Sequence, residues 1–569
     1  MSIHRGAVMT RMKSAMKPFL ATLVSITLLS SCFQGGGSSQ TTTSPSSKAE
    51  DRSPEAALNA DRQPIDLTFA REITDLDNLL KPFPGETLED NRWTRIYELE
   101  LGIRIKYDWT AKGDQFRQKL GISLATGNIP DVVRVDAQQL RELSNAGLIQ
   151  DLSEVYVKYA TPFTKQVLSQ EGSGPFEAAT IDGKLMGIPE SSSSIEGAEY
   201  IWIRTDWLDT LGLQPPRTME ELLTISKAFT EDDPDRNGMK DTFGLAMTNY
   251  IWDPVAGLMG FMAGYGAYPR LWLKDESGSL VFGGIQPEVK EALRTLQMMY
   301  RSGQIDGEFA MKDGAKVKND TADGKIGIVY GEQWSSFWLG LSRERNPRSD
   351  WQAYPIVGIA GLTPKVPLPF STNQYLAVRK GYAHPEAIVQ LINLHLEKNW
   401  GPTAEYETYY STPFPAWQLS PVTPFPPKKN LEAYLQLAEA RRTGNKSVLR
   451  DEAKAIQKNI DLYLAGGPDK ETGWGWERTY GPTGAFAILD QYERNGQLLY
   501  ENFVGGPTET MIEKQSILNN LLYDTYINII LGNPIAEFDR FVEEWRRLGG
   551  DKITAEVNEW YAGRGRNLN

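Results

Sequence analysis

The chain has 569 residues, a formal net charge of −13 at pH 7 and a single cysteine, Cys32. This length exceeds what one hydrophobic core usually organises, so we expect two lobes or more. An acidic chain without a basic block is a poor partner for nucleic acid, and one cysteine excludes a disulfide within the chain.

The first 31 residues have the pattern of a secretory signal peptide. Basic side chains precede an apolar run at residues 18–29, which is shorter than the roughly 20 residues that a membrane-spanning helix needs. The run ends in Leu-Ser-Ser-Cys, which resembles the bacterial lipobox, where the cysteine becomes the lipidated first residue of the mature protein. We therefore predict lipidation of Cys32; the alternative is an unimportant cysteine in a discarded leader.

Residues 32–62 are rich in Gly, Ser, Thr and Pro and contain almost nothing apolar to bury. Such a composition favours a lipidated flexible tether over a packed element. We expect the chain on the extracellular face of the cell membrane, or on the periplasmic side where the cell has an outer membrane. Its only contact with the membrane would be the lipid anchor.

From residue 65 onward, short apolar strands alternate with amphipathic helices. The alternation with short connections predicts parallel βαβ units and an α/β lobe, in which ligands bind beyond the carboxyl ends of the strands. The expected strands are 65–70, 103–109 and 131–135, and the expected helices are 91–102, 114–127 and 137–148.

A second α/β stretch begins after residue 190, with a strand and helices expected over 199–213 and 218–230. The last third of the chain is rich in helical patterns. Between these regions, residues 406–429 are aromatic and too rich in proline and polar residues for a strand.

Several segments, in consistent order, resemble the family 1 extracellular solute-binding proteins of ABC importers. They are YIWIRTDWLDTLGLQPPRTMEELLTISKAF at 200–229, DGKIGIVYGEQW at 323–334, NQYLAVRKGYAHPEAIVQLIN at 373–393 and FDRFVEEWRRLGGDKITAEVNEWY at 538–561. The resemblance implies a type II periplasmic-binding-protein-like fold: two α/β lobes with an interlobe cleft and a helix-rich C-terminal region. It extends to the long alginate-oligosaccharide-binding members.

The resemblance also implies how the chain divides. We expect the N-terminal lobe to begin with residues 63–188 and the C-terminal lobe with 189–372. Residues 373–430 would cross over and return to the N-terminal lobe, and the helix-rich segment 431–569 would pack mainly on the C-terminal lobe. The implied function is capture of a carbohydrate, most simply an oligosaccharide, and its delivery to the permease subunits of an ABC importer by a monomer.

Trp334 is the leading candidate for ligand contact, because it occupies the position of a sugar-stacking tryptophan in the maltodextrin binders that the segment 323–334 resembles. An indole face suits a pyranose, whose C–H groups pack on the ring while its hydroxyls remain at the edge. Trp338 lies one helical turn later. For both residues the alternative is a place in the core.

The other candidates have weaker support. Tyr250 and Trp252 follow an expected strand at 244–247, and Trp417 lies in the proline-rich stretch. Trp474 and Trp476 are flanked by glycines, which favours an exposed loop. The polar candidates at strand ends are Asn373, Arg204 and Glu190, for which the alternative is a structural ion pair or helix cap.

Residues 233–241 have the pattern of a calcium-binding loop. Oxygen donors fall at loop positions 1, 3, 5 and 9, Gly238 stands at the sharp turn, and the residue after it offers its carbonyl. The EF-hand acid at position 12 is replaced by Gly244, and Thr242 stands where the alginate-binding relatives have an acid. The predicted structural Ca²⁺ ligands are Asp233, Asp235, Asn237, Met239 and Asp241; the alternative is a simple turn.

An enzyme is the rival class of protein, for instance a secreted glycosidase or lyase that uses paired carboxylates in the cleft. The chain contains no H-E-x-x-H, G-x-S-x-G or phosphate-binding glycine motif. His384 and His395, the two histidines beyond the leader, both fall in an expected helix. We therefore predict binding without catalysis.

Overall fold

The computed structural model describes residues 64–73, 76–411 and 415–564, all within one compact unit, Ser53–Asn569. The predicted signal peptide, the tether and the lipidation site Cys32 lie outside the described residues. In the part of the chain that is described, no helix combines the length and the apolar character needed to cross a membrane.

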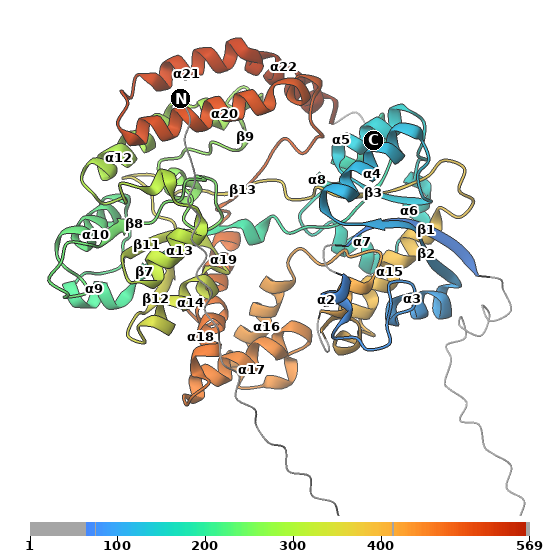
Figure 1. Cartoon of the computed structure of the whole chain (residues 1–569), viewed down its shortest axis with the longest axis horizontal. Helices are drawn as coiled ribbons and strands as arrows, with labels where there is room; N and C mark the ends of the chain where they lie inside the picture. The colour runs from blue at the N-terminus through green and yellow to red at the C-terminus, as the bar shows by residue number, and fades with distance from the viewer. Residues whose placement is uncertain (1–63, 74–75, 412–414, 565–569) are drawn as a thin grey trace, which may run out of the picture. The chain divides into compact units, whose positions relative to one another are not determined.

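The first sheet has the strand order β2-β1-β3-β14-β6. Figure 1 shows its strands β1, β2 and β3 side by side. β1 pairs in parallel with β2 and β3, whereas β14 is antiparallel to both β3 and β6. β2 alternates with a period of two at its start, because Ile103 and Ile105 are buried while Arg104 and Lys106 are exposed. The bounds are β1 (Ile65–Glu72), β2 (Ile103–Ala111), β3 (Val132–Val135), β14 (Tyr375–Val378) and β6 (Ile188–Pro189).

Helices and one small hairpin complete the first lobe. The helix predicted at 91–102 consists of α3 and a π-helical turn, η1, and it ends as expected at Gly102, whose φ of 67° is left-handed. The elements are α2 (Leu76–Leu80), α3 (Arg92–Ile96), η1 (Tyr97–Leu101), α4 (Gly113–Thr126), α5 (Ala137–Asn145), α6 (Ser153–Tyr159), α7 (Pro162–Leu168), α8 (Gly174–Ala179), β4 (Thr180–Ile181), β5 (Lys184–Leu185) and α15 (Glu386–Trp400).

The second sheet has the order β12-β7-β11-β8, in which β7 is antiparallel to β11 and β12 while β8 is parallel to β11. Every residue of β7 is buried: residues 200–203 form an apolar run, and the charged Glu199 and Arg204 at its two ends are buried with them. The elements are β7 (Glu199–Arg204), β8 (Phe243–Leu245), β11 (Ile326–Glu332), β12 (Trp351–Tyr354), α9 (Thr205–Leu211), α10 (Met219–Glu231), α11 (Met259–Ala263), α12 (Pro287–Arg301), α13 (Gly314–Ala322) and α14 (Ser335–Arg345).

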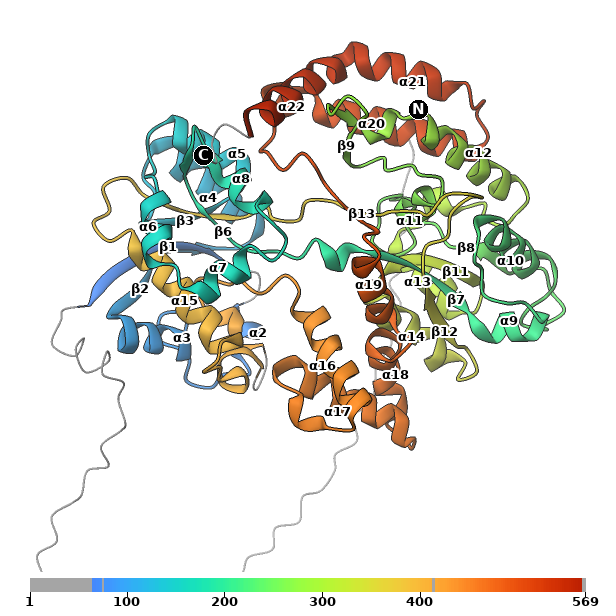
Figure 2. The ribbon, with the colours of Figure 1, turned by 180° about the vertical axis from the view of Figure 1, so that it is seen from behind.

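The helix-rich end of the chain shares a core with the second sheet. Figure 2 shows α20, α21 and α22 together beside α12, and the Tyr526 hydroxyl on α20 donates to the Gly284 carbonyl at 2.6 Å. The elements are α16 (Lys429–Thr443), α17 (Asp451–Ala465), α18 (Lys470–Tyr480), α19 (Ala485–Arg494), α20 (Glu509–Leu531), α21 (Glu537–Trp545), η8 (Arg546–Gly550) and α22 (Asp551–Gly563). Two small sheets pair β9 (Trp272–Lys274) with β10 (Leu280–Phe282) and β13 (Val366–Leu368) with β15 (Leu498–Tyr500).

Two separate hydrophobic cores define the two lobes. Buried residues between 67 and 188 and between 375 and 422 form the first core, and those between 195 and 368 and between 431 and 557 form the second. The chain therefore crosses between the lobes near residues 190–194, 369–374 and 423–430. The predicted α/β architecture of two lobes with a helix-rich end is confirmed.

Hydrogen bonds made by three serines link these crossings to one another. The Ser191 hydroxyl donates to the Phe425 carbonyl at 2.6 Å and accepts from the Phe425 amide at 3.0 Å. The Ser193 hydroxyl donates to the Pro427 carbonyl at 2.6 Å, and the Ser194 hydroxyl lies 2.9 Å from that of Ser371. The run of serines at 191–194 thus joins all three segments through hydrogen bonds.

Candidate functional site

Two adjoining cavities lie on the first lobe, where its strands end. The larger encloses about 820 Å³ and the smaller about 310 Å³. Both sizes fall within, or close to, the range of small-molecule sites. Four residues line both cavities and so form their common wall: Arg134, Gln374, Trp417 and Thr423.

The topology of the first sheet explains this position. The carboxyl ends of β1 and β3 and the beginning of the antiparallel strand β14 meet at one edge, which brings Arg71, Arg134 and Gln374 together around the larger cavity. Asp136 follows β3 and caps α5, because its carboxylate accepts from the Gln139 amide at 2.8 Å. The cavity thus occupies the edge at which open α/β sheets bind ligands.

Glu190 fixes the common wall. Its two oxygens lie 2.7 Å from Nε and Nη2 of Arg134, and it also accepts from the amide and hydroxyl of Thr423 at 2.7 and 2.8 Å. Its own amide donates to the Gln374 carbonyl at 2.9 Å. Glu190 therefore connects three separate parts of the chain at the wall of the smaller cavity. Because these contacts occupy its carboxylate, its role is to position the neighbouring residues around a ligand.

Aromatic rings form much of the smaller cavity. Trp400, Tyr410, Trp417 and Phe425 line it together with polar side chains that include Asn373 and Lys429. Tyr410 lies between two indoles, with ring centroids 6.3 Å from Trp417 and 5.1 Å from Trp400. Flat apolar faces beside amide and charged groups suit a polyhydroxylated ring, which offers C–H faces and hydroxyl edges.

His395 also lines the smaller cavity but is 1 % exposed. Burial lowers the pKa of its imidazole to about 3, so the ring is neutral at physiological pH. The ring stacks on Trp93 at 4.6 Å, and its Nε2 lies 3.2 Å from the amide nitrogen of Asn399. His395 is thus a packed member of the first lobe.

Trp334 lies at the carboxyl end of β11 and begins α14 on the second lobe. It is half-buried, and its indole N–H donates to Glu332 at 2.7 Å. Burial raises the pKa of Glu332 to about 7 and that of Glu199, its neighbour across the strands, to about 8. The charge of Glu196, two residues after the crossing at 190–194, also raises the pKa of Glu332, which places Trp334 near the connection between the lobes.

The remaining predicted aromatic residues of the second lobe vary in exposure. Tyr250 is 51 % exposed, whereas Trp252 is half-buried against the edge of the Tyr526 ring. Trp338 and Trp476 are half-buried against the core, and Trp476 meets the edge of Phe337 at 5.0 Å. None of these residues lines the two cavities on the first lobe.

The prediction that Trp474 and Trp476 lie on a loop is wrong, because both belong to α18. A side chain at Gly473 would meet the Asn459 carbonyl of α17 at 2.1 Å, and one at Gly475 would meet the Phe337 ring at 2.8 Å. These glycines serve close helix packing rather than a turn. Trp474 is 1 % exposed and its indole donates to Asp350 at 3.1 Å, which leaves no ring face for a ligand.

Arg204 is likewise structural rather than a ligand contact. It is 2 % exposed, donates to both oxygens of Asp206 at 2.8 and 2.6 Å, and lies over the Trp207 ring at 4.5 Å. For Arg204, the structure therefore agrees with the alternative stated from the sequence, a structural ion pair.

The loop at 233–241 has a compact arrangement of oxygen donors. The Asn237 amide group donates to Asp235 at 2.9 Å and to Asp241 at 3.1 Å, while Asp233 accepts from the backbone of Asn237 and Gly238, each at 3.0 Å. Within the described residues no group of three or more His, Cys, Asp or Glu side chains has the geometry of a metal site. The donors are all oxygens, as a hard cation requires, but Asn237 presents N–H groups between the two carboxylates.

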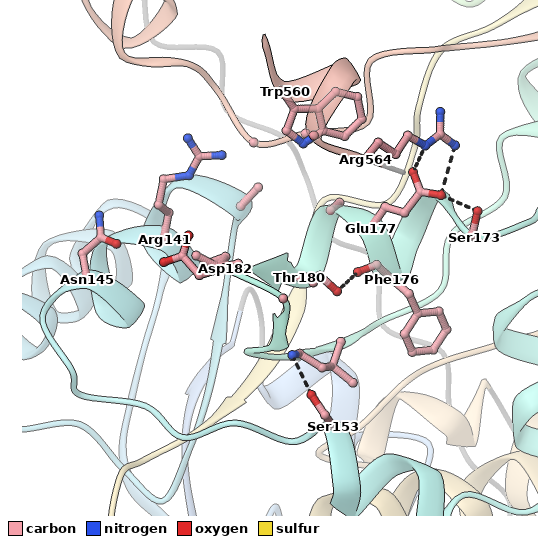
Figure 3. A pocket seen from close by; sticks show the side chains of 18 residues that line it. Arg141, Asn145, Ser153, Ser173, Phe176, Glu177, Thr180, Asp182, Trp560 and Arg564 are labelled. Atoms are coloured by element: carbon pink, nitrogen blue, oxygen red, sulfur yellow. Dashed lines mark hydrogen bonds and ion pairs between the residues drawn. The ribbon is translucent and has the colours of Figure 1, made fainter. Parts of the chain in front are cut away.

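A third cavity of about 480 Å³ lies away from the strand ends, between α5, α8 and α22 (Figure 3). Arg564 pairs there with Glu177 at 3.0 Å, and Trp560 covers Gly505, where a side chain would meet the indole nitrogen at 2.9 Å. This cavity shares no lining residue with the other two and contains none of the predicted site residues. We therefore place the candidate site at the cavity pair.

Of the predicted residues, the structure brings Trp417, Asn373 and Glu190 together at the cavity pair. Sequence reasoning missed Arg71, Arg134, Trp400, Tyr410 and Phe425. The aromatic composition of 406–429 was a usable signal for Tyr410 and Phe425. Arg134, a charged residue near the end of an apolar strand, was a second signal.

Comparisons with known proteins agree with this architecture. The model of the family described as bacterial extracellular solute-binding protein matches residues 82–398, more than half of the chain. Lipoprotein LipO of Bacillus subtilis is 23 % identical over 493 residues, which cover 82 % of this chain and 88 % of LipO. The polygalacturonan/rhamnogalacturonan-binding protein YtcQ of the same organism is 31 % identical over 241 residues, 42 % of this chain and 46 % of YtcQ.

Solved structures show the same fold. An extracellular solute-binding protein from Bifidobacterium longum subsp. infantis superposes with a TM-score of 0.59 at 18 % identity, covering 89 % of this chain and 99 % of that one. An EF-hand mutant of the Streptococcus pneumoniae substrate-binding protein FusA, in complex with fructo-nystose, has a TM-score of 0.54 at 17 % identity, covering 88 % and 100 %. The two-lobed periplasmic-binding-protein-like fold is thereby confirmed.

Proposed function

Because the chain belongs to the bacterial extracellular solute-binding protein family, we propose that it captures an oligosaccharide and presents it to the permease subunits of an ABC importer. Membership also means that the chain binds a solute and does not transform it, which removes the glycosidase or lyase alternative. The proposal of a carbohydrate ligand is supported by FusA and YtcQ, whose names or complexes record oligosaccharides or polysaccharides.

The observation that carries this proposal is the common wall of the cavity pair. Trp417 contributes an indole to both cavities, while Arg134, Gln374 and Thr423 supply fixed hydrogen-bonding groups beside it. Together the two cavities enclose more space than a single sugar ring fills, so an oligosaccharide fits them better than a monosaccharide. Trp334 would contact the ligand from the second lobe, since it lies at a strand end near the crossing segment.

The test is a thermal-shift panel on the purified protein, followed by calorimetry. Fructo-, malto-, galacturonate and alginate oligosaccharides of three to six units cover neutral and acidic classes. We expect at least one class to raise the melting temperature and to bind stoichiometrically. No binding by any oligosaccharide, together with stabilisation by an amino acid or peptide probe, would contradict the proposal.

We further propose that Cys32 carries a lipid anchor and that the protein acts as a monomer at the cell surface. The similarity to a lipoprotein, LipO, and the extracellular character of the family support this location. Cys32→Ala should release the protein from the membrane fraction and abolish incorporation of labelled palmitate. Unchanged membrane retention of this variant would contradict the anchor.

Finally, we propose that the loop at 233–241 holds a structural Ca²⁺. Asp233, Asp235, Asn237 and Asp241 would supply side-chain oxygens, and Met239 its carbonyl; rotation of the Asn237 amide by 180° would replace its N–H groups by an oxygen. A ligand present at 100 times its dissociation constant adds about 2.7 kcal/mol to stability. Chelation should therefore lower the melting temperature of wild type but not of Asp235→Asn/Asp241→Asn, and equal responses would contradict the site.

A further inference from the structure

Two arginines of the larger cavity differ in how their guanidinium groups are used. Arg134 presents Nε and Nη2, the side edge of its guanidinium, to the two oxygens of Glu190, each at 2.7 Å. That edge is the part of an arginine that matches a carboxylate with two parallel hydrogen bonds. Arg134 is therefore already paired with a carboxylate of the protein.

Arg71 has the opposite arrangement. Its Nη1 donates to the Tyr107 hydroxyl at 2.9 Å and to the Leu419 carbonyl at 3.1 Å, and its Nη2 donates to the Gln418 carbonyl. These three acceptors are neutral and hold the guanidinium from one side. In the described part of the chain, neither Nε nor the second Nη2 hydrogen has a partner, and no carboxylate pairs with Arg71.

The surroundings leave this charge available to a ligand. Arg71 is half-buried at the carboxyl end of β1 and lines the larger cavity, and partial burial strengthens the attraction between opposite charges. Two carboxylates also line that cavity: Asp136 is engaged in capping α5, and Glu72 is exposed to solvent. A third arginine, Arg117, pairs with Asp114 at the exposed surface.

From this arrangement we propose that the oligosaccharide is acidic and that Arg71 binds a carboxylate of one of its uronate units through its unused side edge. The inference rests on the proposed function and specifies the chemical class of its ligand. Arg71 is the residue that distinguishes a uronate from the neutral sugar of the same shape. The fixed guanidinium loses little conformational freedom on binding, because its three protein contacts already orient it.

The experiment compares two ligands with the same sugar chain, trigalacturonate and its fully methyl-esterified form, measured by calorimetry at physiological salt. The ester removes the charge and adds one methyl group to each carboxyl, and the Arg71 variants separate these two effects. A charge-assisted pair in a half-buried site supports about a tenfold preference for the free acid in wild type. Arg71→Gln should remove that preference, and Arg71→Lys should restore only part of it. Arg117→Gln, which removes the same charge from the same cavity, should keep the preference.

The outcomes separate the inference from the proposed function. Equal affinity of wild type for acid and ester, or an unchanged preference in a folded Arg71→Gln variant, would overturn the role of Arg71. Binding of fructo- or malto-oligosaccharides with no binding of uronates would overturn the inference while the proposed function stands. Melting temperatures measured on each variant show which of them are folded, and Arg71→Lys provides the second test if Arg71→Gln is not.

Discussion

Tryptophans of the two lobes, all candidates for the same role, have different environments. Trp417 of the first lobe belongs to a short 3-10 turn, η6 (Ala416–Leu419), among proline-rich segments, and it faces two cavities. Trp474 of the second lobe belongs to a regular helix that α17 covers closely at Gly473. In these two cases the difference follows from packing: the short turn leaves Trp417 at a cavity wall, whereas the close approach of α17 and α18 buries Trp474.

The largest expected effect of a substitution is a loss of stability at Trp474, which would test whether this tryptophan belongs to the core. Trp474→Ala leaves a hole in the core and the Asp350 carboxylate without its indole donor, so unfolding should become easier by about 3–5 kcal/mol. Chemical denaturation measures this loss, and affinity per folded molecule should stay unchanged. Equal stability of variant and wild type would show that the second-lobe tryptophan is not a core residue.

Trp417→Ala should produce the reverse pattern. Loss of its ring face at both cavities should weaken oligosaccharide binding at least tenfold, about 1.4 kcal/mol, while stability falls less than in Trp474→Ala. Trp252→Ala, which removes another half-buried indole away from the cavities, is the matched control. If both variants lose the same affinity, or neither does, the cavity pair is not where the sugar binds.

Much of the fold could be predicted because local patterns and tertiary structure agree. The alternation in β2, the left-handed Gly102 and the apolar run of β7 each specify an element without reference to the rest of the chain. The helix α5 was also predicted, although it ends at Asn145, two residues before the positive-φ Gly147.

The site was harder to predict because its walls come from distant segments. Arg71, which lines the larger cavity, and Leu419, whose carbonyl accepts from it, are 348 residues apart in the chain. Glycine has two structural roles that the sequence alone does not distinguish. Gly102 ends a helix, whereas Gly473 allows a neighbouring helix to pack closely. Arg204 and Trp474 were chosen by residue type, and only packing shows that both are buried.

The smallest expected effect concerns Glu332, which accepts the indole N–H of Trp334, the tryptophan that follows β11 of the second lobe. Burial raises the pKa of Glu332 to about 7, with Glu196 and Asp253 adding to the rise. The folded protein therefore holds a proton that the unfolded chain, with an ordinary carboxyl, releases near pH 4.5.

The sign of the pH dependence follows from this difference in bound protons. The contribution of Glu332 to stability is fully present below about pH 4.5 and is lost as the pH rises through about 7, because charging a buried carboxyl then opposes folding. Glu332→Gln keeps an acceptor for Trp334 but cannot titrate. As the pH rises from 5 to 8, the free energy of unfolding of wild type should therefore fall more steeply than that of Glu332→Gln. Glu199, whose pKa burial raises to about 8, titrates in both proteins, but the charge of Glu332 adds to that rise only in wild type. The difference between the two profiles therefore includes the coupling of this pair. Parallel pH profiles would show that Glu332 is charged in the folded protein throughout this pH range. The end of β11 would then be exposed to solvent rather than buried.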